Sequence, residues 1–467
     1  MQDDRDLLED REMEVWESEP PPRERPPGLS LPLLIALSGV VLLALLALLD
    51  AQAQERQMWG DALLYAKPLP IPEDEQILPV ILRQLPEPRS PLLDGLEETA
   101  QGREAVQKLQ LDKGEWVVLL PVSGDTLMGL LADGRIPARG RFEAVAGDLA
   151  RGTSFELDGH KFEVVGRLQR GVGGLSFAFV LPDDETYRPL FAPETGATKG
   201  WLDLSGRQRL AALPPDEVKQ FLEPVGPMPR AGKGVPAGVI LGLLLVALGG
   251  SVFYYRIFIR LASRGVRGAQ GMLEDVRDRP GLFWGMHVLM YGVFFLMMLL
   301  AVNYPIATMR IEHYVGEELT KGSLRHIGAA YASGDVMLAA VVTFAHNFFL
   351  ATLLYTIVLS LVVPFGGVIK NLLTFMVVGF VMAPLWLGSA WGMSFHSITM
   401  AIELGAYIVA SFAVAVLPIR AAQGFSRGEF WPQFVRGLQT VWGAVLISGS
   451  MLAAAALYEA ATLILLT

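Results

Sequence analysis

Seven apolar stretches constrain this chain more than any other feature of its sequence. Each approaches the length that an α-helix needs to cross the hydrocarbon core of a bilayer, roughly 20 residues. Lipid offers no hydrogen-bond partners, so a spanning backbone has to satisfy its own polar groups, as a helix does. The pattern predicts a polytopic α-helical membrane protein with about seven transmembrane helices. The stretches are Leu31–Leu49, Val235–Phe258, Leu282–Val302, Val336–Val363, Leu372–Leu387, Ser397–Pro418 and Val441–Leu466.

The composition supports a membrane location. Of 467 residues, 52% are hydrophobic and only 18% are charged, which is too apolar for an ordinary soluble protein. The chain has no cysteine, so disulfides, thiolate chemistry and cysteine-type metal sites are excluded. The net charge of −10 hides an uneven distribution, because acids gather in the polar segments and arginines flank the apolar ones.

The apolar stretches divide the chain into six regions. Residues 1–30 are acidic and proline-rich, which predicts a disordered cytoplasmic tail, with a short partner-binding helix as the alternative. Residues 31–50 form the first transmembrane helix. Ala51-Gln-Ala53 resembles a signal-peptide cleavage site, but the apolar core is long and the segment before it is acidic, so we favour an uncleaved anchor. An extracytosolic α+β domain (51–233), a second transmembrane helix (235–258), a basic cytoplasmic loop (259–281) and a five-helix membrane domain (282–467) come next.

The predicted extracytosolic domain carries short-range signals of mixed α and β structure. The segment before Glu115 is rich in proline and acids, and we expect it to lie on the surface of the rest of the domain. Asp158-Gly159 is a strong β-hairpin turn signal. The predicted elements are a strand over Trp116–Pro121, a helix over Asp125–Ala132, a hairpin over Phe155–Val165 and a strand over Leu175–Leu181.

Arginines set the predicted orientation. Six of them lie between Arg256 and Arg279, and such a density of positive charge marks a cytoplasmic loop. The N-terminus is therefore expected in the cytoplasm of a bacterium and residues 51–233 outside its inner membrane. Lys370 and the arginines after the sixth stretch place two later turns inside. A cytosolic partner is a candidate ligand for this loop, although attraction to anionic lipid explains the same charges, and nucleic acid is not needed. The candidate docking residues are Arg260, Arg264, Arg267, Arg277 and Arg279.

Polar side chains inside the last apolar stretches form the candidate site. An ionisable group at the bilayer centre costs roughly 3 kcal/mol and needs a partner or a water-filled cavity. The spacing of His396, Thr399 and Glu403 places all three on one helix face. Two interpretations remain open, namely a polar clasp between helices and a site for a transported or reacting species. We expect Glu403 to pair with the fourth helix. The cluster is His346, Asn347, Asn371, His396, Thr399 and Glu403.

The C-terminal part resembles a known membrane family. Phe344-Ala-His-Asn347, Gly366-Gly367, Asn371 followed by Gly379, and Thr399-Met-Ala-Ile-Glu403-Leu are similar to motifs of the stage II sporulation protein M (SpoIIM) family. That family has Asn-Asn where this chain has His346-Asn347, and His-Gly where it has Thr399-Met400. The resemblance covers about residues 280–467 and implies a non-enzymatic membrane core.

The soluble part resembles a second family. The run Leu130–Gly147, containing Gly-Arg-Ile-Pro and Glu-Ala-Val, followed by Phe162–Arg167, is similar to the periplasmic core domain of MacB- and FtsX-type ABC permeases. The match covers about residues 116–185. It implies an α+β fold between the first two transmembrane helices and an association with an ABC-type ATPase.

Three functional hypotheses are consistent with these features. The sequence has neither a Gly-x-x-x-x-Gly-Lys-Ser/Thr loop nor a His-Glu-x-x-His motif, so we predict no enzyme, cofactor or metal site. The first hypothesis is a subunit of a transport or cell-envelope assembly complex, with an ATPase supplied in trans, an envelope or periplasmic protein partner, and a homodimer left open. The alternative is a self-contained channel or transporter with an intramembrane His/Asn/Glu path. An intramembrane hydrolase ranks last, because no nucleophile accompanies Glu403.

Overall fold

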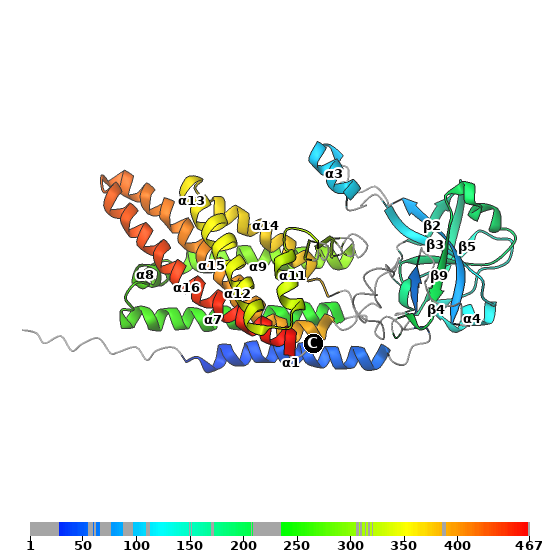
Figure 1. Cartoon of the computed structure of the whole chain (residues 1–467), viewed down its shortest axis with the longest axis horizontal. Helices are drawn as coiled ribbons and strands as arrows, with labels where there is room; N and C mark the ends of the chain where they lie inside the picture. Colours follow the sequence, from blue (N-terminus) through cyan, green and yellow to red (C-terminus); the bar gives the residue numbers. More distant parts are fainter. Residues whose placement is uncertain are drawn as a thin grey trace, which may run out of the picture.

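The structure is a computed structural model in which helices and strands form two separate bodies (Figure 1). It describes residues 28–54, 59, 62–65, 76–86, 97–108, 113–148, 150, 152–169, 172–206, 208, 235–304, 308, 311–312, 314–315, 318–319, 321–384 and 389–465. The predicted disordered tail falls almost entirely outside the described residues. Helices α1 and α7 run side by side and lead to and from the body that holds the strands.

Six helical spans of the described chain are long and apolar enough to cross a membrane, which indicates a multi-pass membrane protein. The fourth of them is continuous but is built from three pieces, α12, the π-helix η4 and α13. A further apolar helix, α14, has 16 residues and is shorter than a full span. The elements are α1 (Ser30–Gln54), α7 (Val235–Arg264), α9 (Pro280–Asn303), α12 (Val336–Ala345), η4 (His346–Val358), α13 (Leu359–Val362), α14 (Gly366–Val381), α15 (Ser389–Arg427) and α16 (Phe430–Leu465).

The helix boundaries differ from the predicted ones in several places. Helix α16 begins at Phe430, well before the predicted Val441. Helix α14 begins before Leu372 and ends at Val381, because Pro384 disfavours helical backbone in the residue before it. Helix α15 runs well past the predicted Ser397–Pro418 and contains Pro418. The predicted basic loop is largely helical, since α7 continues to Arg264 and α8 (Gln270–Asp278) comes after it.

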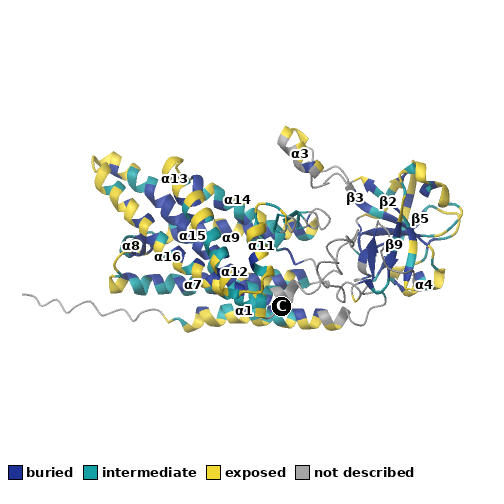
Figure 2. Ribbon diagram, in the orientation of Figure 1, coloured by how far each residue is buried: buried dark blue, intermediate teal, exposed yellow. Residues whose placement is uncertain are grey.

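Helix α15 forms the centre of the helical body. Every residue from Leu404 to Leu417 is buried, and the helix contacts α1, α7, α9, α14, η4 and α16 (Figure 2). The outer helices leave many leucines exposed, as expected for surfaces that face lipid. Helices α1 and α7 approach closely at Gly39 and Gly242, where an added Cβ would collide with the facing helix. Small residues of this kind permit tight packing between membrane helices.

The strands form one mixed sheet with a hydrophobic cluster on each face. Within the described residues the order is β1-β9-β2-β3-β8-β5-β7-β4, with β6 paired to β7. The pairs β3–β8 and β5–β7 are parallel and the others antiparallel. The strands are β1 (Leu63–Tyr65), β2 (Ile77–Pro86), β3 (Lys113–Leu120), β4 (Leu131–Gly134), β5 (Glu143–Ala146), β6 (Ser154–Leu157), β7 (His160–Leu168), β8 (Ala178–Pro182) and β9 (Thr198–Asp203). Short helices α3 (Ala100–Lys108), α4 (Gly124–Gly129), η1 (Gly173–Leu175), η2 (Arg188–Phe191) and η3 (Pro193–Thr195) accompany them.

The sheet contains the predicted hairpin, but the segment before Glu115 and the helix after Pro121 differ from the predictions. Asp158 and Gly159 both have positive φ and join β6 to β7, as the turn signal predicted. The expectation that the segment before Glu115 lies only on the surface was wrong, because β2 pairs with β3 on one side and β9 on the other. Leu82 of that strand is fully buried in the core. The predicted helix over Asp125–Ala132 ends at Gly129, and β4 begins at Leu131.

Candidate functional site

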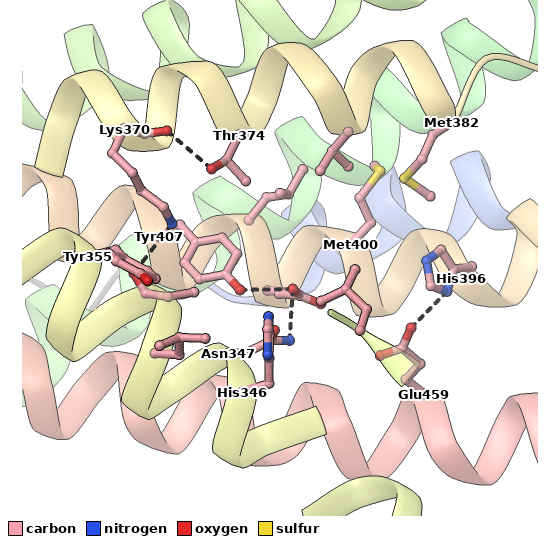
Figure 3. Close-up of a pocket in the computed structure, with 16 residues that line it drawn as sticks. His346, Asn347, Tyr355, Lys370, Thr374, Met382, His396, Met400, Tyr407 and Glu459 are labelled. Atoms are coloured by element: carbon pink, nitrogen blue, oxygen red, sulfur yellow. Dashed lines mark hydrogen bonds and ion pairs between the residues drawn. The ribbon is translucent and has the colours of Figure 1, made fainter. Parts of the chain in front are cut away.

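A cavity of about 500 Å³ lies within the helical body between η4, α14, α15 and α16 (Figure 3). Its wall mixes ionisable and apolar side chains, and most of the ionisable ones belong to helices apolar enough to cross a membrane. Ligand sites of helical bundles occupy this kind of position, between facing helices. The lining residues are Leu324, His346, Asn347, Leu350, Ala351, Tyr355, Lys370, Thr374, Val378, Met382, His396, Met400, Glu403, Leu404, Tyr407 and Glu459.

Glu403 is one of two carboxylates in the wall of this cavity. Its Oε1 accepts hydrogen bonds from Asn347 Nδ2 and from the hydroxyl of Tyr407, each at 3.0 Å (Figure 3). Tyr407 lies one helical turn further along α15, and Asn347 comes from η4, as the expected pairing with the fourth helix required. Among the hydrogen bonds of the described residues, both donors to Glu403 are neutral.

The π-helical geometry of η4 shapes this side of the cavity. Thr352 and Thr356 donate to the carbonyl groups five residues before them, Asn347 at 2.8 Å and Ala351 at 2.9 Å. π-helical turns are rare and often occur at functional sites. Gly367 of α14 packs against the carbonyl of Thr356, where an added Cβ would collide. This close approach brings the start of α14 against η4.

Asn371 joins three helices behind the cavity wall. Its Oδ1 accepts from Thr356 Oγ1 at 3.1 Å, and its Nδ2 donates to Ser411 Oγ at 2.9 Å. The side chain is fully buried, so these bonds satisfy polar atoms that would otherwise be costly. Asn371 therefore clasps η4, α14 and α15 and does not line the cavity.

Lys370 lines the cavity, a role that sequence reasoning did not give it, and its predicted place on the cytoplasmic side stays a prediction. Its Nζ donates to the carbonyl of Ala351 at 3.3 Å and to Asn371 Oδ1 at 3.2 Å. It also lies 5.6 Å from the centroid of the Tyr407 ring, within the range of a cation–π contact. The side chain follows the face of α14 that packs on η4 and α15, so it points inward.

A second carboxylate, Glu459, lines the cavity on the side opposite Lys370 (Figure 3). Glu459 of α16 is 14% exposed, and its Oε1 is 3.7 Å from Nδ1 of His396 on α15. His346 lies on the same cavity wall as Asn347, and its ring is 5.6 Å from that of His326 in α11 (Arg325–Ala332). The cavity therefore brings together ionisable groups from η4, α14, α15 and α16.

The structure unites four of the six predicted cluster residues in one cavity wall, namely His346, Asn347, His396 and Glu403. Asn371 and Thr399 are buried elsewhere in the packing. Sequence reasoning missed Lys370, Tyr407 and Glu459. Glu459 carried the same signal as Glu403, an ionisable residue within an apolar stretch, and that signal was enough to find it. Tyr407 carried no such signal.

His287 of α9 has the structural role that a single histidine on an apolar helix usually has. It is 3% exposed, and its Nδ1 donates to the carbonyl of Phe283 at 2.8 Å. That bond fixes the tautomer, so Nε2 accepts from the hydroxyl of Tyr254. Both ring nitrogens are satisfied within the packing, and His287 does not line the cavity.

The predicted docking arginines separate into two groups. Arg264, Arg267 and Arg277 are exposed. Arg260 is half-buried on α7, and Arg279 turns toward the bundle, where it donates to Asp275 at 3.2 Å and to Gln423 at 3.0 Å. The five arginines therefore do not form one uniform exposed surface.

Asp275 of α8 is the centre of a second polar cluster, which sequence reasoning did not single out. The residue is fully buried, and Arg420 of α15 donates to it twice, at 2.6 and 3.1 Å. Thr440 of α16 donates at 2.5 Å. These bonds fasten α8 against α15 and α16, and no lining residue of the cavity takes part in them.

Comparisons with protein-family models, with curated proteins and with solved structures found no match for this chain. The resemblances to the SpoIIM family and to MacB- and FtsX-type permeases therefore stay predictions. Within the described part of the chain, no three His, Cys, Asp or Glu residues come together in a way that would hold a metal ion.

Proposed function

We propose that this protein is a membrane transport component whose helical body binds a polar solute in the cavity around Glu403. The observation that carries the proposal is a cavity of about 500 Å³ into which the carboxylates of Glu403 and Glu459 both face. Ionisable groups within membrane helices are costly, and they commonly mark the paths of substrates and ions. A purely structural clasp does not need an open volume beside it, so the geometry favours the self-contained transporter over the clasp.

The orientation we propose is based on the arginines. Helix α8 and the turn between α15 and α16 lie at the end of the helical body away from the strands (Figure 1). Arg264, Arg267 and Arg427 are exposed at that end. Positive charge favours the cytoplasmic side, so we propose that this end faces the cytoplasm of a bacterium and the sheet domain faces out from its inner membrane.

Single cysteines test the cavity, because the chain has none of its own. Thr374 lines the cavity, whereas Val377 on the same helix is 55% exposed on an apolar surface. We expect a small hydrophilic thiol reagent to label Thr374→Cys and to leave Val377→Cys unlabelled, because a thiol in hydrocarbon does not ionise. Equal labelling of the two variants would contradict a solvated cavity.

The same labelling in sealed vesicles tests transport and orientation. A transporter exposes its cavity to each side in turn, so we expect Thr374→Cys to react with reagent added to either side. Ser154 is exposed on β6 of the sheet domain, and Ser154→Cys should react only from the extracytosolic side. Reaction of Ser154→Cys from the cytoplasmic side alone would reverse the proposed orientation.

A second candidate is a non-enzymatic subunit that works with an ATPase supplied in trans. It is favoured by the exposed Arg264, Arg267 and Arg277 around α8, which offer charge to a cytosolic partner. Replacing Arg264 and Arg267 by Gln should release such a partner while the protein still inserts. Co-purification of the same proteins with this variant and with the wild type would leave attraction to anionic lipid as the role of these residues.

A further inference from the structure

The two ends of the cavity carry opposite charges. Glu403 of α15, Glu459 of α16 and Lys370 of α14 all line it, and Figure 3 shows Lys370 and Glu459 on opposite sides. The Tyr407 side chain lies between these ends, with its hydroxyl on Glu403 and its ring beside the Lys370 ammonium. Tyr407 therefore separates the Lys370 ammonium from the Glu403 carboxylate.

Among the described residues, Lys370 hydrogen-bonds to neutral partners only. Its hydrogen bonds go to a backbone carbonyl and to a side-chain amide oxygen, and no carboxylate of the described residues lies within ion-pair distance of it. An ammonium group in a membrane protein is stabilised most by a negative charge, which the cavity wall does not supply at this end. The position fits the anionic group of a ligand.

The two carboxylates, in turn, lack a permanently charged cationic partner among these contacts. Glu403 accepts from Asn347 and Tyr407, and Glu459 has His396 at 3.7 Å. Histidine is a cation only when it is protonated, so neither carboxylate has a permanent positive partner among the contacts above. A ligand amine would supply one. The wall also contains apolar side chains, among them Leu350, Val378 and Met400.

We propose that the cavity binds a zwitterion, with an amine held by Glu403 and Glu459 and an anionic group held by Lys370. The inference rests on the proposed function, because it requires a cavity that a solute can enter. The apolar side chains of the wall fit a short hydrocarbon spacer. A free ω-amino acid and an aminophospholipid headgroup share this chemistry, and the two sources are separated by the test. A volume of about 500 Å³ lies in the range of small-ligand pockets.

The test measures the binding of three probes to the purified full-length protein by calorimetry. They are 6-aminohexanoate, hexylamine, which lacks the carboxylate, and glycerophosphoethanolamine, which represents the lipid headgroup. We expect the wild type to bind at least one zwitterion about tenfold more tightly than hexylamine, because a hydrogen bond to a charged group has that strength. The tighter zwitterion identifies the source. Equal affinity for hexylamine and both zwitterions would overturn the proposal.

Variants assign the two ends. Lys370→Met should abolish the tenfold preference for the zwitterion and leave hexylamine binding nearly unchanged, whereas Lys370→Arg should restore the preference. Lys321→Met is the matched control, since Lys321 is exposed and does not line the cavity. Glu403→Gln should weaken all three probes together. An unchanged preference in Lys370→Met would contradict the assignment.

The outcomes separate this inference from the proposed function. If Thr374→Cys is labelled but both zwitterions bind no more tightly than hexylamine, the cavity is solvated and the proposal that it binds a zwitterion is wrong. If Thr374→Cys is not labelled, the solute cavity itself is wrong.

Discussion

Two carboxylates of the helical body, the fully buried Asp275 and the half-buried Glu403, are stabilised in different ways. Asp275 has the charged partners Arg420 and Arg279 and does not line the cavity around Glu403. Glu403 has only the neutral donors Asn347 and Tyr407 and faces an open volume. Burying a carboxylate is costly, and it is offset in the first case by ion pairing and in the second by hydrogen bonds. The difference teaches that burial alone does not single out a candidate functional acid, since the open volume beside Glu403 is what distinguishes it from Asp275.

The largest expected effect on stability concerns Asp275. Asp275→Asn leaves the Arg420 guanidinium without its main counter-charge inside the packing, and breaking such a pair costs about 3 kcal/mol. The measurement is chemical or thermal unfolding of the purified protein in detergent. Asp278→Asn on the same helix is the control, because Asp278 and its partner Arg277 are both more than half exposed. Equal stability of the two variants would remove the structural role assigned to Asp275.

An intermediate effect on stability is expected from Glu143, a carboxylate of the sheet domain, which adds a case outside the apolar helices to the comparison. Arg135 donates to Glu143 at 2.7 Å through both of its terminal nitrogens, and the backbone N–H of Ala138 donates at 2.9 Å. These bonds, the Arg135 ones foremost, lower the pKa of Glu143 to about 2 from an ordinary value of 4.5. Because the folded pKa is the lower one, the stabilisation is complete above pH 4.5 and is lost as the pH falls toward 2.

Glu143→Gln should therefore be less stable than the wild type at pH 7 by about 1 kcal/mol, since half-exposed Arg135 is screened by water. The difference should shrink as the pH is lowered toward 2. Circular dichroism of the strand signal in the full-length protein measures this loss, with Glu163→Gln as the exposed control. A difference that stays constant with pH would show that the ion pair is not its source.

The smallest expected effect on stability, and a large one on function, concerns Glu403. Glu403→Gln keeps an oxygen that accepts from Asn347 and Tyr407, and bonds between membrane helices average only about 0.6 kcal/mol. We expect near-normal unfolding but a loss of ligand binding and transport. Glu403→Leu removes both hydrogen bonds and should cost somewhat more. If Glu403→Gln destabilised the protein as much as Asp275→Asn does, the polar clasp would be the better interpretation.

Part of the site could be predicted from sequence because polar residues stand out in apolar stretches. Glu403, His346, Asn347 and His396 were found in this way, and the expected pairing of Glu403 with η4 is confirmed at Asn347. The place of Lys370 in the cavity wall was overlooked, because a lysine near a helix end was taken only as a marker of the cytoplasmic side. Asp275 was overlooked because an acid among arginines on a polar segment looks like a solvated charge. Neither error could be detected without knowing which helix face is packed.

The sequence by itself determined the spans of apolar helix and the Asp158-Gly159 hairpin, because these depend on local hydrophobicity and backbone preference. It also determined that His396 and Glu403 share a helix face, which is a consequence of helical geometry alone. Only the tertiary structure decided that Glu459 and Lys370 come to the same cavity, since four separate helices meet there. It likewise decided that β2 lies inside the sheet. Contacts between distant segments depend on how whole faces pack, and no local pattern encodes them.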